Sequence, residues 1–153
     1  MKQVGDLGEH LVSRWLQLQN YEILARNWHC RWGEIDLVAR DRHAQTIAFV
    51  EVKTRSANNW DTDGLLAITA SKQEKLFKTA SLFLAATPRL EDLPCRFDVA
   101  LVSYRHDSSS IPPRNSFTNN LDRLAASLVE IGNIIALDGA QLSLKTYLQN
   151  AFD

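Results

Sequence analysis

The sequence has few of the features that mark a fibrous, secreted or membrane protein. Its 153 residues include six glycines and four prolines, too few for a fibrous or low-complexity chain. The longest apolar runs, such as residues 134–137, fall far short of the roughly 20 residues that span a bilayer. The first residues do not show the charged and then apolar pattern of a signal peptide. These absences predict a cytoplasmic globular protein that does not enter a membrane.

Cysteine is also scarce, and neither sign of charge is in excess. Cys30 and Cys95 lie far apart and outside any CxxC motif, and the four histidines lack the spacing of zinc ligands, so the sequence does not encode a zinc site. Lysine and arginine total 17 against 18 acidic residues, for a formal net charge of −1. This balance counts against a tight non-specific binder of nucleic acid. It does not count against an enzyme with a local basic groove around acidic metal ligands.

The chain is long enough and apolar enough to bury one core. With 45% hydrophobic and 23% charged residues, it predicts a single domain over residues 1–153 that needs no disulfide or metal to fold. Hydrophobic periodicity predicts an amphipathic helix near residues 5–19, followed by apolar and β-branched strands. The predicted strands cover residues 21–25, 33–40, 46–54 and 96–103.

A second helix is predicted between the last two of these strands. Ser71 and Glu74 fit a capping box at its start, and Pro88 limits its end. The order helix, three strands, helix, strand predicts an α/β fold with a central mixed sheet flanked by helices. The short turns suit antiparallel neighbours, and the second helix permits a parallel crossover.

The remaining segments have weaker patterns. Residues 56–64 and 105–120 are polar and are predicted to be loops. Residues 121–135 have mixed apolar spacing that assigns no element. Residues 143–152 are predicted to form a short closing helix.

Two of the predicted strands carry charged residues among apolar ones. Because side chains alternate along a strand, Glu51 and Lys53 project from one face, while Val50 and Val52 face the other way. Asp36 stands between apolar neighbours on the preceding strand. If these strands pair, Asp36 and Glu51 approach each other, and two close carboxylates repel unless a cation lies between them.

This arrangement suits the hydrolysis of a phosphodiester. Mg²⁺ prefers oxygen ligands and is typically held by one or two carboxylates together with substrate phosphate. Asp36 and Glu51 would bind the metal, and Glu9 could complete its shell directly or through water. Lys53 would position or help deprotonate the attacking water, or neutralise charge in the transition state. Each of these residues alone is more typical of a solvated surface charge, so the prediction depends on the set.

The order of these motifs resembles the PD-(D/E)xK nuclease superfamily. Glu9 is followed by residues 33–38, then by residues 49–55, and then by Lys72 in a helix. Within the superfamily the chain is most similar to the YraN-like family of bacterial proteins, which in turn resemble archaeal Holliday junction resolvases. The resemblance covers roughly the first two-thirds of the chain, and residues 105–142 look like an insertion or an appended segment.

The resemblance implies a restriction-endonuclease-like core of helix, three strands, helix and strand. It also implies Mg²⁺ or Mn²⁺ held by Asp36 and Glu51, with Lys53 as the catalytic lysine. Glu9 would be an accessory catalytic acid and a further metal ligand. Ile35 precedes Asp36 where the superfamily often has proline, as is usual in the resolvase-like branch.

Basic and aromatic residues near the motifs are candidates for contact with nucleic acid. The basic ones are Arg31, Arg55, Lys72 and Lys75, whose phosphate contacts would position a strand without reading its sequence. Trp28 and Trp32 are predicted either to join the core or to stack on unpaired bases. Asp98 is predicted to be structural and to pair locally with Arg96.

Three functions stay open on the sequence alone. The set of motifs favours a metal-dependent endonuclease acting on branched or otherwise structured DNA. Nucleic acid would be its partner, and a homodimer would match substrates that present two strands. The alternatives are a catalytically silent nucleic-acid-binding module of the same fold, and a protein-interaction domain that uses residues 105–142.

Overall fold

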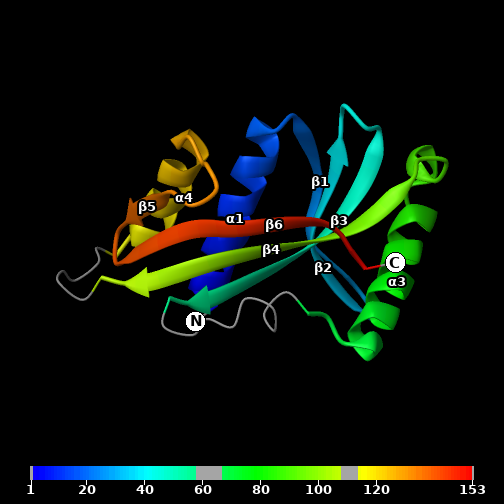
Figure 1. Ribbon diagram of the computed structural model, residues 1–153, viewed down its shortest axis with the longest axis horizontal. Coiled ribbons are helices and arrows are strands. Elements are labelled where there is room, and N and C mark those ends of the chain that lie inside the picture. Colours follow the sequence, from blue (N-terminus) through cyan, green and yellow to red (C-terminus); the bar gives the residue numbers. More distant parts are fainter. Residues whose placement is uncertain (1, 58–66, 108–113, 153) are drawn as a thin grey trace.

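One mixed β-sheet forms the centre of the protein (Figure 1). The computed structural model describes residues 2–57, 67–107 and 114–152. In chain order, the elements of these residues are α1 (Lys2–Leu18), β1 (Tyr21–Cys30), β2 (Gly33–Asp41), β3 (Thr46–Ser56), α3 (Ala70–Ala85), the 3-10 turn η1 (Pro88–Leu90), β4 (Cys95–His106), α4 (Ser116–Ala126), β5 (Ile134–Leu137) and β6 (Ala140–Phe152).

The sheet has the order β1-β2-β3-β4-β6-β5. β1, β2 and β3 pair antiparallel through short turns, whereas β3 and β4 are parallel and are connected through α3. β6 pairs antiparallel with both β4 and β5. The predicted α/β fold is therefore confirmed, including its parallel crossover. Its order of helix, three strands, helix and strand is that of a restriction-endonuclease-like core.

Helices cover both faces of this sheet. On one face, Leu11 and Leu16 of α1 and Leu124 of α4 are buried in one apolar cluster. On the other face, Leu76 and Phe83 of α3 belong to a second cluster. Because β3 sends alternate side chains into the two clusters, this strand is apolar on both sides until it reaches its charged residues.

α1 lies close to β3 because it presents a glycine to the strand. A β-carbon added at Gly8 would come within 2.3 Å of the Thr54 hydroxyl, so a larger residue would push the helix away. The close approach brings the next residue, Glu9, to the sheet. A second glycine, Gly33, is the first residue of β2 and has a φ of +143°, a conformation that other residues rarely adopt.

The C-terminal residues form a strand, so the prediction of a closing helix over residues 143–152 is wrong. In β6, Leu142, Ser143 and Leu144 are buried in succession, and the flanking Gln141 and Lys145 are exposed. Leu144, Tyr147 and Leu148 also have the spacing of one face of a helix. A segment this short can satisfy both the helical and the strand period. Pairing with the free edge of β4 decides in favour of the strand.

The predicted loop over residues 105–120 is wrong at both ends. β4 continues through His106, and α4 begins at Ser116; residues 108–113 lie outside the described residues. α4 is too short to be stable alone. Its apolar residues pack on the cluster that contains α1, a contact that local sequence does not reveal.

Residues 121–135, which carried no assignment, contain the end of α4 and the start of β5. Of the predicted loop over residues 56–64, Ser56 is the last residue of β3 and Ala57 lies in a turn. The rest of that loop lies outside the described residues.

α3 is capped two residues before the predicted cap, and by a different residue. The hydroxyl of Thr69 accepts a hydrogen bond from the Lys72 backbone N–H at 3.2 Å. The predicted capping box of Ser71 and Glu74 is wrong, since both lie inside the helix and Glu74 pairs with Lys78 at 3.4 Å. Threonine supplies the same capping oxygen as serine, and the earlier start sets the direction of Lys72.

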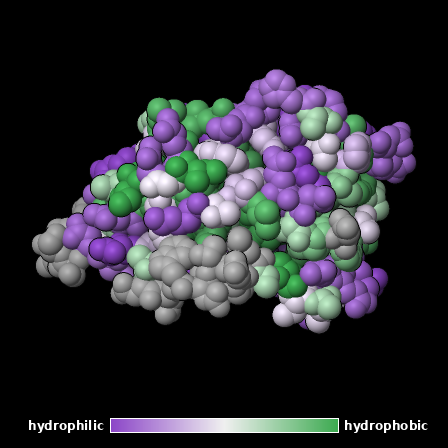
Figure 2. All heavy atoms as spheres, in the orientation of Figure 1, coloured by the Kyte–Doolittle hydropathy of each residue, from purple (hydrophilic) through white to green (hydrophobic). Residues whose placement is uncertain are grey.

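The segment 105–142 adds α4 and β5 at one end of the sheet, beside α1 (Figure 1). Hydrophobic residues reach the surface at this end (Figure 2), where Leu128, Ile131 and Ile134 are exposed.

In the described ranges, no helix combines the length and the apolar character that crossing a membrane requires.

Candidate functional site

The site begins where β2 and β3 separate. Their ladder ends at the pair Leu37–Val50, although both strands extend past it. Beyond this point the carboxylate of Asp36 accepts a hydrogen bond from the Val52 backbone N–H at 2.8 Å. Asp36 is 9% exposed. Its side chain thus takes the place of a missing strand partner and is held in the gap between the two strands.

Glu51 lies on the opposite side of this gap and pairs with a lysine of α3. The Nζ atom of Lys72 is 2.5 Å from a carboxylate oxygen of Glu51, whose side chain is 13% exposed. The Thr69 cap fixes the first turn of α3 and therefore the origin of Lys72. As the side chains stand, Lys72 neutralises Glu51 at the edge of the site.

Carboxylates act on Asp36 from three elements. Burial, followed by the charge of Glu51, raises the pKa of Asp36 well above its usual range. Glu9 and Glu34 raise it further, and the hydrogen bond from Val52 only partly opposes them. This part of the sheet therefore concentrates negative charge around a buried acid, which is costly without a cation.

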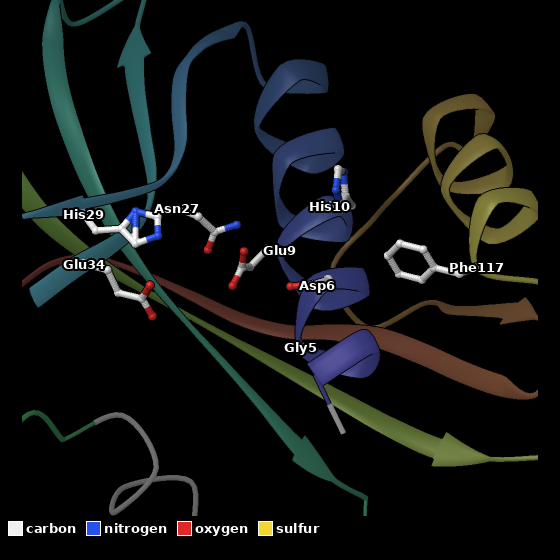
Figure 3. Close-up of a pocket in the computed structure, with 8 residues that line it drawn as sticks. All are labelled: Gly5, Asp6, Glu9, His10, Asn27, His29, Glu34 and Phe117. Atoms are coloured by element: carbon white, nitrogen blue, oxygen red, sulfur yellow. The ribbon is translucent and has the colours of Figure 1, made fainter.

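Glu9 enters the site from α1 and faces Asn27 of β1 (Figure 3). Burial raises the pKa of Glu9 to about 7, against a hydrogen bond with Asn27 that lowers it; Asp6, Glu34 and Glu51 add to the rise. Asn27 has a φ of +49° and interrupts the pairing of β1 with β2 opposite Asp36. This left-handed conformation turns the side-chain amide of Asn27 toward Glu9 of α1.

A cleft of about 580 Å³ opens in front of Glu9 and Asn27. Its lining comes from α1, β1, β2 and α4 (Figure 3), with the residues Gly5, Asp6, Glu9, His10, Asn27, His29, Glu34 and Phe117. A second cavity of about 140 Å³ is lined by Asp36, Glu51, Lys72 and Lys75 among others. Glu34 lines both, so the acids lie where the two hollows adjoin.

Lys53 lies on the same side of β3 as Glu51, whose charge acts on it, but its amine has a different hydrogen-bond partner. Its Nζ atom donates to the carbonyl of Ala67 at 2.7 Å, and the residue is 9% exposed. Burial, followed by the charges of Arg55 and Lys72, lowers the pKa of this amine. A buried amine with a lowered pKa is able to take part in proton transfer more readily than a solvated lysine.

The predicted acids Glu9, Asp36 and Glu51 therefore share one region of the molecule, and Lys53 lies beside them with its amine turned to Ala67. Of the predicted basic residues, Lys72 and Lys75 line the smaller cavity. Arg31 and Arg55 are exposed; Arg55 acts on Lys53, and Arg31 lies near Trp32 at the β1–β2 turn.

Glu34 and Asn27 were not predicted. Glu34 stands two residues before Asp36, so strand alternation could have placed both on one face. Asn27 could not be found this way, because its role depends on a left-handed residue inside β1. Within the part of the chain that the structure describes, no three acidic, histidine or cysteine side chains are arranged to hold a metal ion as they stand.

The fold and the site define an α/β protein with a restriction-endonuclease-like core and an acidic cluster where two central strands diverge. The model of a family described as "Uncharacterised protein family UPF0102" matches residues 8–102. The chain belongs to this family, which confirms the resemblance to the YraN-like proteins.

The similarity of the chain to individual members of this family covers two thirds of it or more. A UPF0102 protein of Acaryochloris marina is 50% identical over 157 residues, which cover 98% of this chain and 90% of the relative. One from a Synechocystis species is 43% identical over 152 residues, with 99% of each chain covered. One from Thermosynechococcus vestitus is 53% identical over 105 residues, 69% of this chain and 84% of the relative.

Proposed function

We propose that the protein is a metal-dependent endonuclease that hydrolyses phosphodiester bonds in nucleic acid, with branched or otherwise structured DNA as its substrate. The observation that carries this proposal is the position of Asp36. It is buried where β2 and β3 separate, and the charges of Glu51, Glu9 and Glu34 act on it. Such a cluster has its most favourable state with a divalent cation bound.

The donor set fits Mg²⁺ or Mn²⁺. Carboxylate oxygens are the ligands that these ions prefer, and Mg²⁺ commonly takes one or two from the protein while it keeps several waters. Asp36 and Glu51 would hold the ion, with Glu9 as a further ligand, so a cluster of three close ligands is not required beforehand. The ion would polarise the phosphoryl group and lower the pKa of a bound water.

The basic residues would serve the substrate. Lys53 would orient the attacking water or stabilise charge that develops on the phosphate. Lys72 now neutralises Glu51, and a metal at this acid would release it to bind phosphate. Lys75, Arg31 and Arg55 would bind neighbouring phosphates and so hold the strand in place without reading its sequence.

The decisive measurement is metal binding by isothermal titration calorimetry. Mg²⁺ and Mn²⁺ are titrated into the wild type, into Asp36→Asn, and into Asp92→Asn as a control at an exposed position between η1 and β4. We expect the wild type and the control to bind alike and Asp36→Asn to lose binding. Negligible binding in all three proteins would contradict the proposed mechanism.

Cleavage is then tested on a panel of labelled hairpin, flap, four-way and single-stranded DNA with Mn²⁺. We expect cuts in at least one structured substrate, and none with Asp36→Asn or Lys53→Met. A wild type that cleaves no member of the panel with either metal would reject the proposed activity.

One observation favours a second candidate, a catalytically silent nucleic-acid-binding module. Two lysines of the site already have protein partners, since Lys72 pairs with Glu51 and Lys53 donates to Ala67. A silent module would bind branched DNA with a steep salt dependence and bind no divalent metal. The calorimetric titration therefore separates the two candidates.

A nucleic-acid substrate is consistent with a cytoplasmic location. Substrates with two strands to cut are matched by enzymes with two-fold symmetry, so we also propose that the active form is a homodimer. Its mass in solution, measured with and without a four-way junction, tests this part of the proposal.

A further inference from the structure

A partly exposed tryptophan stands at the edge of the acid site. Trp32 occupies the turn between β1 and β2 and is 37% exposed. It lines the smaller cavity together with Asp36 and Glu51. The turn is held by Gly33, whose φ is +143°, and by a hydrogen bond from the Trp32 N–H to Cys30 Sγ at 3.4 Å. The ring is thus displayed from a defined backbone next to the carboxylates.

The other tryptophan of this hairpin has a different environment. Trp28 packs edge to face on Phe83 of α3, with ring centroids 5.4 Å apart, and belongs to the apolar cluster under that helix. Trp28 is therefore packed against the core. Trp32 carries a large apolar ring partly in solvent, where burial does not explain it.

Two cations lie over the ring of Trp32, and one of them, Lys78, also pairs with Glu74 at the helix surface. Lys78 Nζ lies 4.3 Å from its centroid and Arg31 Cζ lies 5.0 Å from it. Along α3, Lys72, Lys75 and Lys78 are three residues apart and so follow one side of the helix. They form a basic row that begins at Glu51 and ends at the ring. We call Trp32, Arg31 and these three lysines the aromatic–basic edge.

An exposed ring beside a row of cations is the usual means of binding single-stranded nucleic acid. Cations track the phosphates, and the ring stacks on a base whatever its identity. A base inside a duplex is already stacked on both faces and is not available to a ring at the surface. The chemistry of this edge therefore selects an unpaired nucleotide over a paired one.

We propose that Trp32 stacks on an unpaired base that flanks the phosphate held at the acid site, while Lys75, Lys78 and Arg31 bind the phosphates of the same strand. The substrate is then DNA with a single-stranded segment at the cut, such as a flap or an open junction. The position of the cut rests on the proposed function; the affinity for an unpaired strand does not.

The test compares the affinity for a labelled 12-nucleotide single strand with that for a blunt 12-base-pair duplex, by fluorescence anisotropy. Ca²⁺ replaces Mg²⁺, and gels verify that the strands stay intact. We expect Trp32→Leu to weaken single-strand binding about tenfold, a factor that equals about 1.4 kcal/mol and lies in the range for one stacked base. Duplex binding should change less than twofold, and Trp32→Phe should keep most of the single-strand affinity.

A matched pair of charge variants tests the basic row. Lys78→Gln should lower the salt slope of single-strand binding by about one. Lys145→Gln removes the same charge from an exposed position of β6, which lies on the other side of β4 from the site. This variant should leave the salt slope unchanged. Equal circular dichroism spectra and thermal midpoints confirm that each variant is folded.

The two proposals fail in different ways. If Trp32→Leu affects both oligonucleotides equally or neither, the stacking role is wrong, even if the wild type cleaves DNA. If Trp32→Leu loses only the single strand while the wild type binds no Mg²⁺ or Mn²⁺, the stacking role holds and the endonuclease is rejected.

Discussion

Asp36 and Asp98 are two buried carboxylates of the same sheet with opposite surroundings. Asp98 lies on β4, and its side chain is 0% exposed. It receives Arg96 Nε at 3.1 Å on both oxygens, the Tyr147 hydroxyl at 2.6 Å and the Asn150 N–H at 2.9 Å. Its charge is neutralised and its oxygens have donors, which is what a buried carboxylate requires. The predicted pairing of Asp98 with Arg96 is thus confirmed.

Among the described residues Asp36 has one hydrogen-bond donor, the Val52 N–H, and its charged neighbours include three carboxylates. Lys72 pairs with Glu51 instead. The difference shows how a fold keeps a structural acid apart from an acid held for chemistry. The first is supplied with a cation by the chain itself, whereas the second is positioned by one backbone bond and left with negative charge around it. Variants of each acid test whether Asp36 and Asp98 differ in this way.

Asp98→Asn should have the largest effect on stability. It removes the shorter of the two ion pairs of Arg96, which keeps only Asp41 at 3.5 Å, and removing one member of a buried pair costs about 3–5 kcal/mol. Urea unfolding followed by circular dichroism measures the loss. Asp92→Asn, at an exposed position, should change the free energy of unfolding by less than about 0.5 kcal/mol. A small loss for Asp98→Asn would mean that the remaining ion pair with Asp41 is enough for Arg96 and that Asp98 is not structural.

Tyr147→Phe should have an intermediate effect. It removes the hydroxyl that donates to Asp98 and keeps the ring, which stacks near Trp15 with centroids 4.8 Å apart. Loss of one donor to a buried charged acceptor costs about 1–3 kcal/mol. The same urea experiment gives the value, and a double mutant with Asp98→Asn should lose less than the sum, because the two residues share one interaction. Additive losses would contradict the direct coupling of the two side chains.

The fold could be predicted in large part because its core obeys local rules. The continuous apolar and β-branched runs of β2 and β3 and the helical stripe of α1 are strong signals in a single sequence. β6 and α4 could not be predicted, since both depend on distant partners: β6 on the edge of β4, and α4 on α1. The cap at Thr69 was missed because Ser71 and Glu74 offered a competing motif three residues apart.

The site could be predicted only as a set of residue types. Order along the chain suggested Glu9, Asp36 and Glu51, and the fold brings their charges together. The separation of β2 from β3, which gives Asp36 its place, is a property of strand pairing and has no local signature. The pairing of Lys72 with Glu51 likewise depends on how α3 crosses the sheet.

Asp36→Asn should leave stability unchanged or raise the free energy of unfolding by about 1 kcal/mol. The amide oxygen still accepts from Val52, while the repulsion with Glu51 is removed, and relief of such strain at a functional site often stabilises a protein. Thermal unfolding without metal measures the change. With Mg²⁺ added, the wild-type midpoint should rise by mass action and that of Asp36→Asn should not. If Asp36→Asn lowered the free energy of unfolding about as much as Asp98→Asn, both acids would be structural.

The pH dependence of stability should separate the two acids by a smaller but distinct effect. The pKa values of Asp36 and Glu9 are raised in the folded protein, to about 7 for Glu9, so the folded state binds more protons than the unfolded state between pH 4 and neutral. The contribution of these two acids to stability must then fall as the pH rises through this range. Asp36→Asn should flatten the slope and Asp98→Asn should not, in urea midpoints measured without metal at pH 5, 6 and 7. Equal slopes in wild type and Asp36→Asn would show that Asp36 is already neutralised by the chain, and its distinction from Asp98 would disappear.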